Sequence, residues 1–248
     1  MRLNELFELR RRFFRSVEIE QDVAFGQALD GYVVTTLGRS TLDRVSQGVL
    51  GQNRDRAWTL TGPYGAGKSA FALFLSQLLG PESRPTTLQA QQLLKGADRD
   101  LERRFQKIAK AAPKGFCRVL VGGTRGPLLP RLHQAVRRAT DEFFESRMPR
   151  ELAKLLRPMA SGDQTAGRGA DDDTMAMLSA LARAVVGSGG GGVLLVIDEL
   201  GKFLEHAASR EDGDIFVLQR LAEFAARSAE APVLILTMLH QAFERYAL

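Results

Sequence analysis

Residues 62–69 form a glycine-rich segment whose residue types suit phosphate binding. The segment reads Gly62, Pro63, Tyr64, Gly65, Ala66, Gly67, Lys68 and Ser69, and it fits the pattern G-x-x-x-x-G-K-[ST] at every fixed position. Glycines allow backbone N–H groups to wrap around phosphate oxygens, because side chains would block that approach or forbid the dihedral angles. Lys68 offers a mobile positive charge to terminal phosphates, and Ser69 offers a hydroxyl to Mg²⁺. We expect these residues, together with Ala70 beside them, to bind the phosphates of a nucleotide.

A pair of carboxylates, Asp198 and Glu199, directly follows the unbroken apolar run 193–197. Such a run is typical of a strand buried on both faces of a parallel sheet, and ligands collect at the carboxyl ends of these strands. Asp198 is the predicted magnesium ligand, because this small hard cation prefers carboxylate and water oxygens. Glu199 is the predicted general base, which orients and polarises the water that attacks a terminal phosphate.

The next apolar run, 233–237, ends in a third candidate, Thr237. If this strand lies beside 193–197 in the sheet, the Thr237 hydroxyl or the Gln241 amide is placed to contact the γ-phosphate or the attacking water. His240 is an alternative for the same role. A polar residue at a strand end is equally typical of a cap or a turn, so both interpretations of Thr237 stay open.

Strands and helices alternate along the chain, and this alternation predicts how the candidate residues are positioned. Apolar and β-branched runs predict strands at 56–61, 116–121, 193–197 and 233–237. Helical spacing of apolar residues predicts helices at 3–17, 41–50, 69–79, 127–144, 174–186 and 215–227, one or two helices within 86–112, and a helix beginning at 241–246. The polar stretch 161–173 is a predicted surface loop. The predicted fold class is α/β, a three-layer sandwich with a mainly parallel sheet.

The composition is that of an ordinary globular protein. The 248 residues are 44% apolar and 25% charged, with a mean hydropathy of −0.14, which excludes a largely disordered, collagen-like or membrane class. The apolar run 193–197, like every other apolar run in the sequence, is far shorter than a membrane-spanning helix, and residues 1–15 lack the apolar core of a secretory signal. Cys117 is the only cysteine in the sequence, so an intrachain disulfide and a cysteine-based metal site are excluded. We expect a soluble, cytoplasmic protein with no membrane partner.

Positive charge is concentrated between residues 98 and 157. This stretch holds 15 Lys or Arg against 7 Asp or Glu, whereas the whole chain carries a net charge of +5. A local basic surface attracts phosphate backbones, which makes DNA or RNA a candidate partner. The alternative is a set of solvated helix faces, and the lack of an aromatic ladder that would stack bases favours that alternative.

Three of these segments resemble the P-loop ATPases that have an added catalytic glutamate, the group that includes AAA+ and STAND ATPases. Residues 62–69 look like the Walker A motif, Leu194-Leu-Val-Ile-Asp-Glu199 looks like Walker B, and the strand ending in Thr237 looks like sensor 1. The resemblance implies a P-loop NTPase fold, ATP and Mg²⁺ as cofactors, and Lys68, Glu199 and Thr237 as catalytic residues. The segment 32–42 is similar to the part that touches adenine in origin-recognition and STAND-type members. This likeness makes Tyr32, Val33 and 37–39 candidate base contacts, with an ordinary turn before a helix as the alternative.

The chain also departs from the compact members of this group. Lys68 and Asp198 are 130 positions apart, so 81–116 and 124–190 are expected to be helical insertions. We expect 1–50 to form an N-terminal helical segment on the adenine side and 51–248 to form the ATPase core. This core is expected to stop before its last strand, arginine finger and helical lid, which the remainder of a longer chain, partner subunits or a second copy of this chain would supply. The long spacing and the residues after Asp198 look like N-terminal ATPase modules of large bacterial proteins, some of them in phage-defence loci.

Three functions are compatible with these residues. The first is a Mg²⁺-dependent ATPase module that drives conformational change in a larger assembly acting on nucleic acid or in defence. The second is a nucleotide-gated switch or scaffold, similar to STAND proteins, that turns ATP over slowly. The third is a P-loop kinase, which Glu199 disfavours because a kinase needs an acceptor pocket rather than a carboxylate poised for water. The sequence lacks the Asn-Lys-x-Asp pattern of guanine recognition, which favours ATP over GTP.

Overall fold

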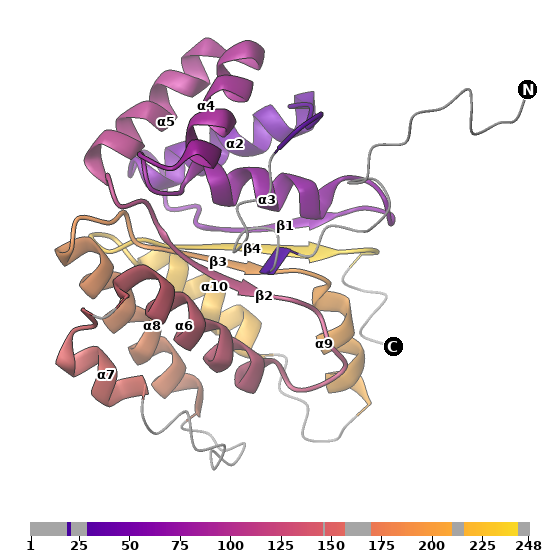
Figure 1. Ribbon diagram of the computed structural model, residues 1–248. Coiled ribbons are helices and arrows are strands. Elements are labelled where there is room, and N and C mark those ends of the chain that lie inside the picture. The colour runs from indigo at the N-terminus through magenta and orange to yellow at the C-terminus, as the bar shows by residue number, and fades with distance from the viewer. Residues whose placement is uncertain (1–18, 21–28, 146, 157–169, 210–215, 243–248) are drawn as a thin grey trace, which may run out of the picture.

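The computed structural model describes residues 19–20, 29–145, 147–156, 170–209 and 216–242. Four strands within these residues form one sheet: β1 (Ala57–Thr61), β2 (Cys117–Val121), β3 (Val193–Ile197) and β4 (Val233–Leu239). All strand pairs are parallel, and the order across the sheet is β1-β4-β3-β2 (Figure 1). The predicted parallel sheet is therefore confirmed, and β3 and β4 are neighbours in it, which was the condition set for a role of Thr237.

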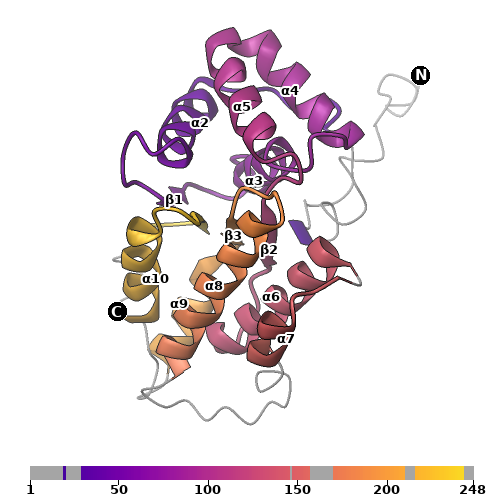
Figure 2. The same cartoon turned by 90° about the vertical axis from the view of Figure 1, so that its left-hand side faces the viewer.

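Helices cover both faces of this sheet, as the two views at right angles show (Figures 1 and 2). One side carries α2 (Thr36–Val49), α3 (Lys68–Leu78), α4 (Pro85–Ala97) and α5 (Arg99–Ala111). The other side carries α6 (Leu128–Phe144), α7 (Arg150–Leu156), α8 (Ala170–Gly187), α9 (Leu200–Ala208) and α10 (Phe216–Arg227). The α/β class and its three layers agree with the sequence prediction. None of the described helices is long and apolar enough to cross a bilayer.

The residues of strand β3 explain why the sheet lies between two layers of helices. All five of its side chains are apolar and fully buried, as expected for a strand with helices on both faces. Because successive side chains point to opposite faces, Leu194 and Val196 join the core under α3, whereas Val193, Leu195 and Ile197 join the core over α6, α8 and α10. Asp198 continues the first of these two sets, so the alternation directs it toward the α3 side.

The predicted elements differ from the structure mainly at their ends. Strand β4 continues to Leu239, two residues beyond the predicted end. Helix α2 begins at Thr36 rather than 41, because the Thr35 hydroxyl caps it by accepting from the Gly38 N–H. Two helices occupy 86–112, since Asp98 ends α4 and caps α5 through the N–H groups of Asp100 and Leu101.

Other predictions were wrong or lie outside the described residues. Helices α7 and α9 were not expected, and 170–173 belong to α8 instead of the predicted loop. The rest of that loop from residue 161, the predicted helix 3–17 and residues 243–246 lie outside the described part of the chain. Residues 241–242, where a last helix was expected to begin, are not helical.

The core on the α3 side gives a matched test of the fold. Leu94 and Leu88 both lie on α4, but Leu94 is 0% exposed and Leu88 is 47% exposed. We expect Leu94→Ala to lower the free energy of unfolding by about 2–5 kcal/mol, because it leaves a cavity, and Leu88→Ala to change it by about 0.5 kcal/mol. Urea denaturation measures both values. Equal losses in the two variants would show that α4 does not pack as described.

Candidate functional site

The glycine-rich segment 62–69 connects the carboxyl end of β1 to the start of α3. Gly65 and Gly67 have φ angles of 77° and 83°, a left-handed conformation that favours glycine over residues with a side chain. Gly67 is also the N-cap of α3, which has no side-chain cap. The loop therefore leads directly into a helix N-terminus, whose N–H groups and dipole favour an anion.

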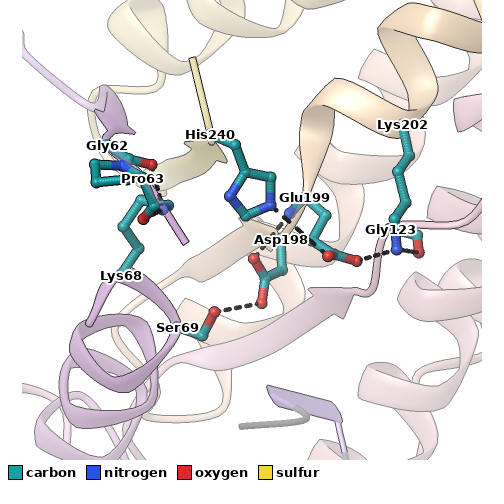
Figure 3. Close-up of polar contacts among 9 residues, drawn as sticks. All are labelled: Gly62, Pro63, Lys68, Ser69, Gly123, Asp198, Glu199, Lys202 and His240. Atoms are coloured by element: carbon teal, nitrogen blue, oxygen red, sulfur yellow. Dashed lines mark hydrogen bonds and ion pairs between the residues drawn. The ribbon is translucent and has the colours of Figure 1, made fainter. Parts of the chain in front are cut away.

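The Lys68 side chain folds back over this loop. Its Nζ atom donates to the carbonyl oxygens of Gly62 at 2.6 Å and Pro63 at 2.8 Å (Figure 3). An ammonium group has three donors, so one N–H remains beyond these two bonds. This arrangement holds a positive charge at the mouth of the loop.

Ser69 and Asp198 meet although 129 positions separate them in the sequence. The Ser69 hydroxyl donates to Asp198 Oδ2 at 2.8 Å, and the Glu199 N–H donates to Asp198 Oδ1 at 2.8 Å (Figure 3). Asp198 is buried, at the end of β3. The structure thus brings together the two residues that the sequence predicts as magnesium ligands.

Glu199 has an unusual backbone and a paired side chain. Its φ and ψ angles are 49° and 43°, which is left-handed and uncommon for a residue with a side chain. The carboxylate lies 2.5 Å from Lys202 Nζ and 3.7 Å from His240 Nε2 (Figure 3). Gly123 permits this position, because a Cβ atom there would lie 2.4 Å from the Cβ of Glu199. Lys202 and Gly123 are site residues that sequence reasoning missed.

His240 joins the end of β4 to the glycine-rich loop. Its ring stacks on Tyr64 with a centroid distance of 3.5 Å and an interplanar angle of 21°. Within the described residues, neither ring nitrogen of His240 has a hydrogen-bond partner, although both are buried. His240 therefore contacts the loop through Tyr64 and approaches the Glu199 carboxylate through Nε2.

Thr237 is not brought to the other candidates. Its hydroxyl forms a 2.8 Å hydrogen bond with the hydroxyl of Thr59 on β1. Along β4, Thr237 lies between Ile235 and Leu239, which face the core under α10, whereas Asp198 faces α3. The strand continues past Thr237 to Leu239, and His240 directly follows its end.

Tyr32 packs against α3, and Val33 follows it at an exposed position. The Tyr32 ring stacks on Phe74 of α3 at 4.6 Å, and burial raises the pKa of its hydroxyl to about 12. Val33 is 72% exposed, and Leu37 is similarly exposed. In the same segment, an added Cβ at Gly38 would touch the Phe71 ring in the first turn of α3. This segment therefore packs against α3, the helix that follows the loop, and leaves two apolar side chains, Val33 and Leu37, exposed.

Glu20 supports the edge of the site from the N-terminal part of the chain. Its Oε1 atom accepts from the Gly122 N–H at 2.6 Å, and its Oε2 atom lies 2.7 Å from Arg138 Nη1. Burial raises the pKa of the Glu20 carboxyl, but the bonds from Arg138 and Gly122 outweigh this effect and lower it overall. Nothing in the pattern around residue 20 indicated this role.

The donor atoms at Ser69 and Asp198 fit a magnesium ion. Among the described residues, no cluster of three or more His, Cys, Asp or Glu side chains is positioned to hold a metal. Mg²⁺ does not need such a cluster, because it keeps several waters and is bound through one or two carboxylates and substrate phosphates. One hydroxyl and one carboxylate, 2.8 Å apart at the end of a phosphate-type loop, match that requirement.

Comparison with known proteins adds no assignment. No protein-family model matches the chain, and no curated protein or solved structure matches it either. The function is therefore inferred from the geometry of the loop and the carboxylates.

The close approach of Gly123 to Glu199 gives a prediction for the site. Gly123→Ala adds a methyl group that meets Glu199 Cβ at 2.4 Å, whereas an added Cβ at Gly126, in the same loop, meets nothing within 4 Å. We expect Gly123→Ala to lower the free energy of unfolding by about 1–3 kcal/mol through overpacking, and Gly126→Ala to change it by less than about 0.5 kcal/mol. Urea denaturation compares them, and an unchanged Gly123→Ala variant would contradict the packing of Glu199.

Proposed function

We propose that this protein is a Mg²⁺-dependent module that binds and hydrolyses ATP, with the fold of a P-loop NTPase. The observation that carries the proposal is the 2.8 Å hydrogen bond between Ser69 and Asp198. It joins the end of the glycine-rich loop to the end of β3, so a ligand on the loop also lies beside the carboxylate pair. A triphosphate with a metal ion needs both contacts at once.

The loop binds the phosphates. Left-handed Gly65 and Gly67 turn the backbone around the site, and the start of α3 supplies N–H groups and a positive dipole end. Lys68 exchanges its bonds to the Gly62 and Pro63 carbonyls for bonds to the terminal phosphates. Ser69 and Asp198 hold the ion, and bound Mg²⁺ neutralises negative charge on the phosphate oxygens.

Glu199 is the general base of the proposed reaction. A water molecule attacks the γ-phosphorus, the bond to the β–γ bridging oxygen breaks, and ADP leaves with that oxygen. Glu199 accepts the proton that the attacking water loses. Lys202 and His240 flank its carboxylate and set its orientation.

The apolar segment over α3 favours an adenine base. Exposed Val33 and Leu37 provide contacts for a purine face, and half-buried Tyr32 stacks on Phe74 and holds the segment on α3. The resemblance to AAA+ and STAND ATPases rests mainly on 62–69 and 194–199, and the likeness of segment 32–42 agrees with it. We extend the proposal accordingly: hydrolysis drives conformational change in a larger assembly, for which the basic stretch 98–157 offers a nucleic-acid contact.

A nucleotide-gated switch with slow turnover is the second candidate, and one contact favours it. The carboxylate of Glu199, the N-cap of α9, lies 2.5 Å from Nζ of Lys202 in the first turn of that helix. This ion pair competes with an attacking water for the carboxylate. A chain that retains this pair with ATP bound would hold the nucleotide without cleaving it quickly.

Lys68→Ala tests nucleotide binding by the loop. We expect the variant to bind ATP at least about tenfold more weakly, because a hydrogen bond to a charged group contributes about 1.5–3 kcal/mol. Isothermal titration with ATP and Mg²⁺ measures the change. Lys95→Ala on α4 is the control, since Lys95 is exposed and away from the loop. If Lys68→Ala bound ATP as tightly as the wild type, the proposal that loop 62–69 binds the phosphates of ATP would be contradicted.

Glu199→Gln separates binding from hydrolysis. The amide retains the shape of the side chain but is not a base, so we expect ATP affinity near that of the wild type and single-turnover hydrolysis slower by about 10²–10⁴-fold. Glu205→Gln, an exposed position on the same helix, is the matched control and should hydrolyse normally. Hydrolysis at the wild-type rate by Glu199→Gln would refute the role of Glu199.

A further inference from the structure

A pocket lies at the amino end of β2, the opposite end of the sheet from the glycine-rich loop. Its volume is about 600 Å³, and Phe116, Phe143 and three prolines form part of its walls. This volume is within the range of pockets that bind small molecules or one unit of a larger ligand. Its charged lining consists of Arg84, Lys114, Arg118, Arg147, Glu142 and Glu145. Four cations therefore face two carboxylates.

Arg118 is the unusual residue of this pocket. Its side chain is 5% exposed, and its Nη2 atom donates to Glu142 Oε1 at 2.9 Å. Its Nη1 atom is buried and has no hydrogen-bond partner among the described residues. Burial lowers the pKa of the Arg118 guanidinium, and Arg84 adds to this effect. A buried cation is costly unless anions and hydrogen bonds compensate it.

The compensation inside the pocket is incomplete. Arg84 Nη1 lies 3.6 Å from the same Glu142 oxygen that Arg118 uses. Two guanidinium groups thus share one oxygen of one half-exposed carboxylate, and Lys114 and Arg147 add further positive charge at the rim. An anion bound in the pocket is therefore attracted electrostatically by all four cations.

We propose that this pocket binds phosphate groups, from a single nucleic-acid strand or from a free phosphorylated small molecule. Planar guanidinium groups match the geometry of phosphate oxygens, and here two converge on one wall. The pocket lies largely within the basic stretch 98–157, which places further positive charge around it. The proposal does not depend on ATP binding at loop 62–69, because the two sites lie at opposite ends of the strands.

The test removes two of the exposed charges that line the pocket and leaves the buried Arg118 in place. The pocket variant is Arg84→Ala with Arg147→Ala. The control is Arg103→Ala with Lys154→Ala, which removes two exposed charges from the same basic stretch outside the pocket. Both carry Lys68→Ala as well, so that loop 62–69 does not dominate phosphate binding. Unfolding midpoints of both variants should equal that of the Lys68→Ala parent.

Two probes distinguish the sources of phosphate. A fluorescein-labelled twelve-residue oligothymidylate, followed by anisotropy, represents a strand, and pyrophosphate, followed by titration calorimetry, represents a small molecule. We expect the pocket variant to bind at least one probe about tenfold more weakly than its parent and the control variant to stay within about twofold. Loss with the oligonucleotide, together with a flatter salt dependence, identifies a strand as the source, and loss with pyrophosphate alone identifies a small molecule.

Two results would overturn the proposal. The first is that neither probe binds to the parent protein. The second is that the control variant weakens binding as much as the pocket variant, which would show diffuse attraction by the whole basic stretch rather than a site.

Discussion

The hydrogen bond between Ser69 and Asp198 is the constraint on which the rest of the site depends. It forms only because β1 and β3 are parallel and β4 separates them, so that the loop after β1 and the carboxylates after β3 open at the same edge. The buried strand β3 fixes the position of Asp198 at its carboxyl end, and the first turn of α3 fixes the position of Ser69. The strand order of the sheet and the start of α3 together determine that the Ser69 hydroxyl meets the Asp198 carboxylate.

The residues around Glu199 determine where its carboxylate lies beside the Ser69–Asp198 pair. Glu199 combines a left-handed backbone with contacts to Lys202 and His240, and Gly123 leaves room for it. Backbone strain of this kind persists only where surrounding packing imposes it. The stack of His240 on Tyr64 extends the same set of contacts to the loop.

The sequence predicted the structure best where the local residue types themselves favour one conformation or one degree of burial. The glycines of 62–69 and the apolar run before Asp198 predicted a loop, a helix start and a buried strand, and the structure has all three. It was least informative where contacts join distant segments: Glu20 with Gly122, Lys202 with Glu199, and Arg118 with Glu142 leave no local pattern. Thr237 was a different case, because the strand end was placed two residues early, and a strand that is buried on both faces does not reveal in its sequence which face each side chain takes.

A crystal structure with Mg²⁺ and a non-hydrolysable ATP analogue tests the central claim most directly. Our account predicts that the analogue's phosphates lie within the N–H groups of 62–69 and that the ion contacts the Ser69 hydroxyl, with Asp198 at direct or water-bridged distance. An analogue bound elsewhere, or an ion remote from both side chains, would contradict it.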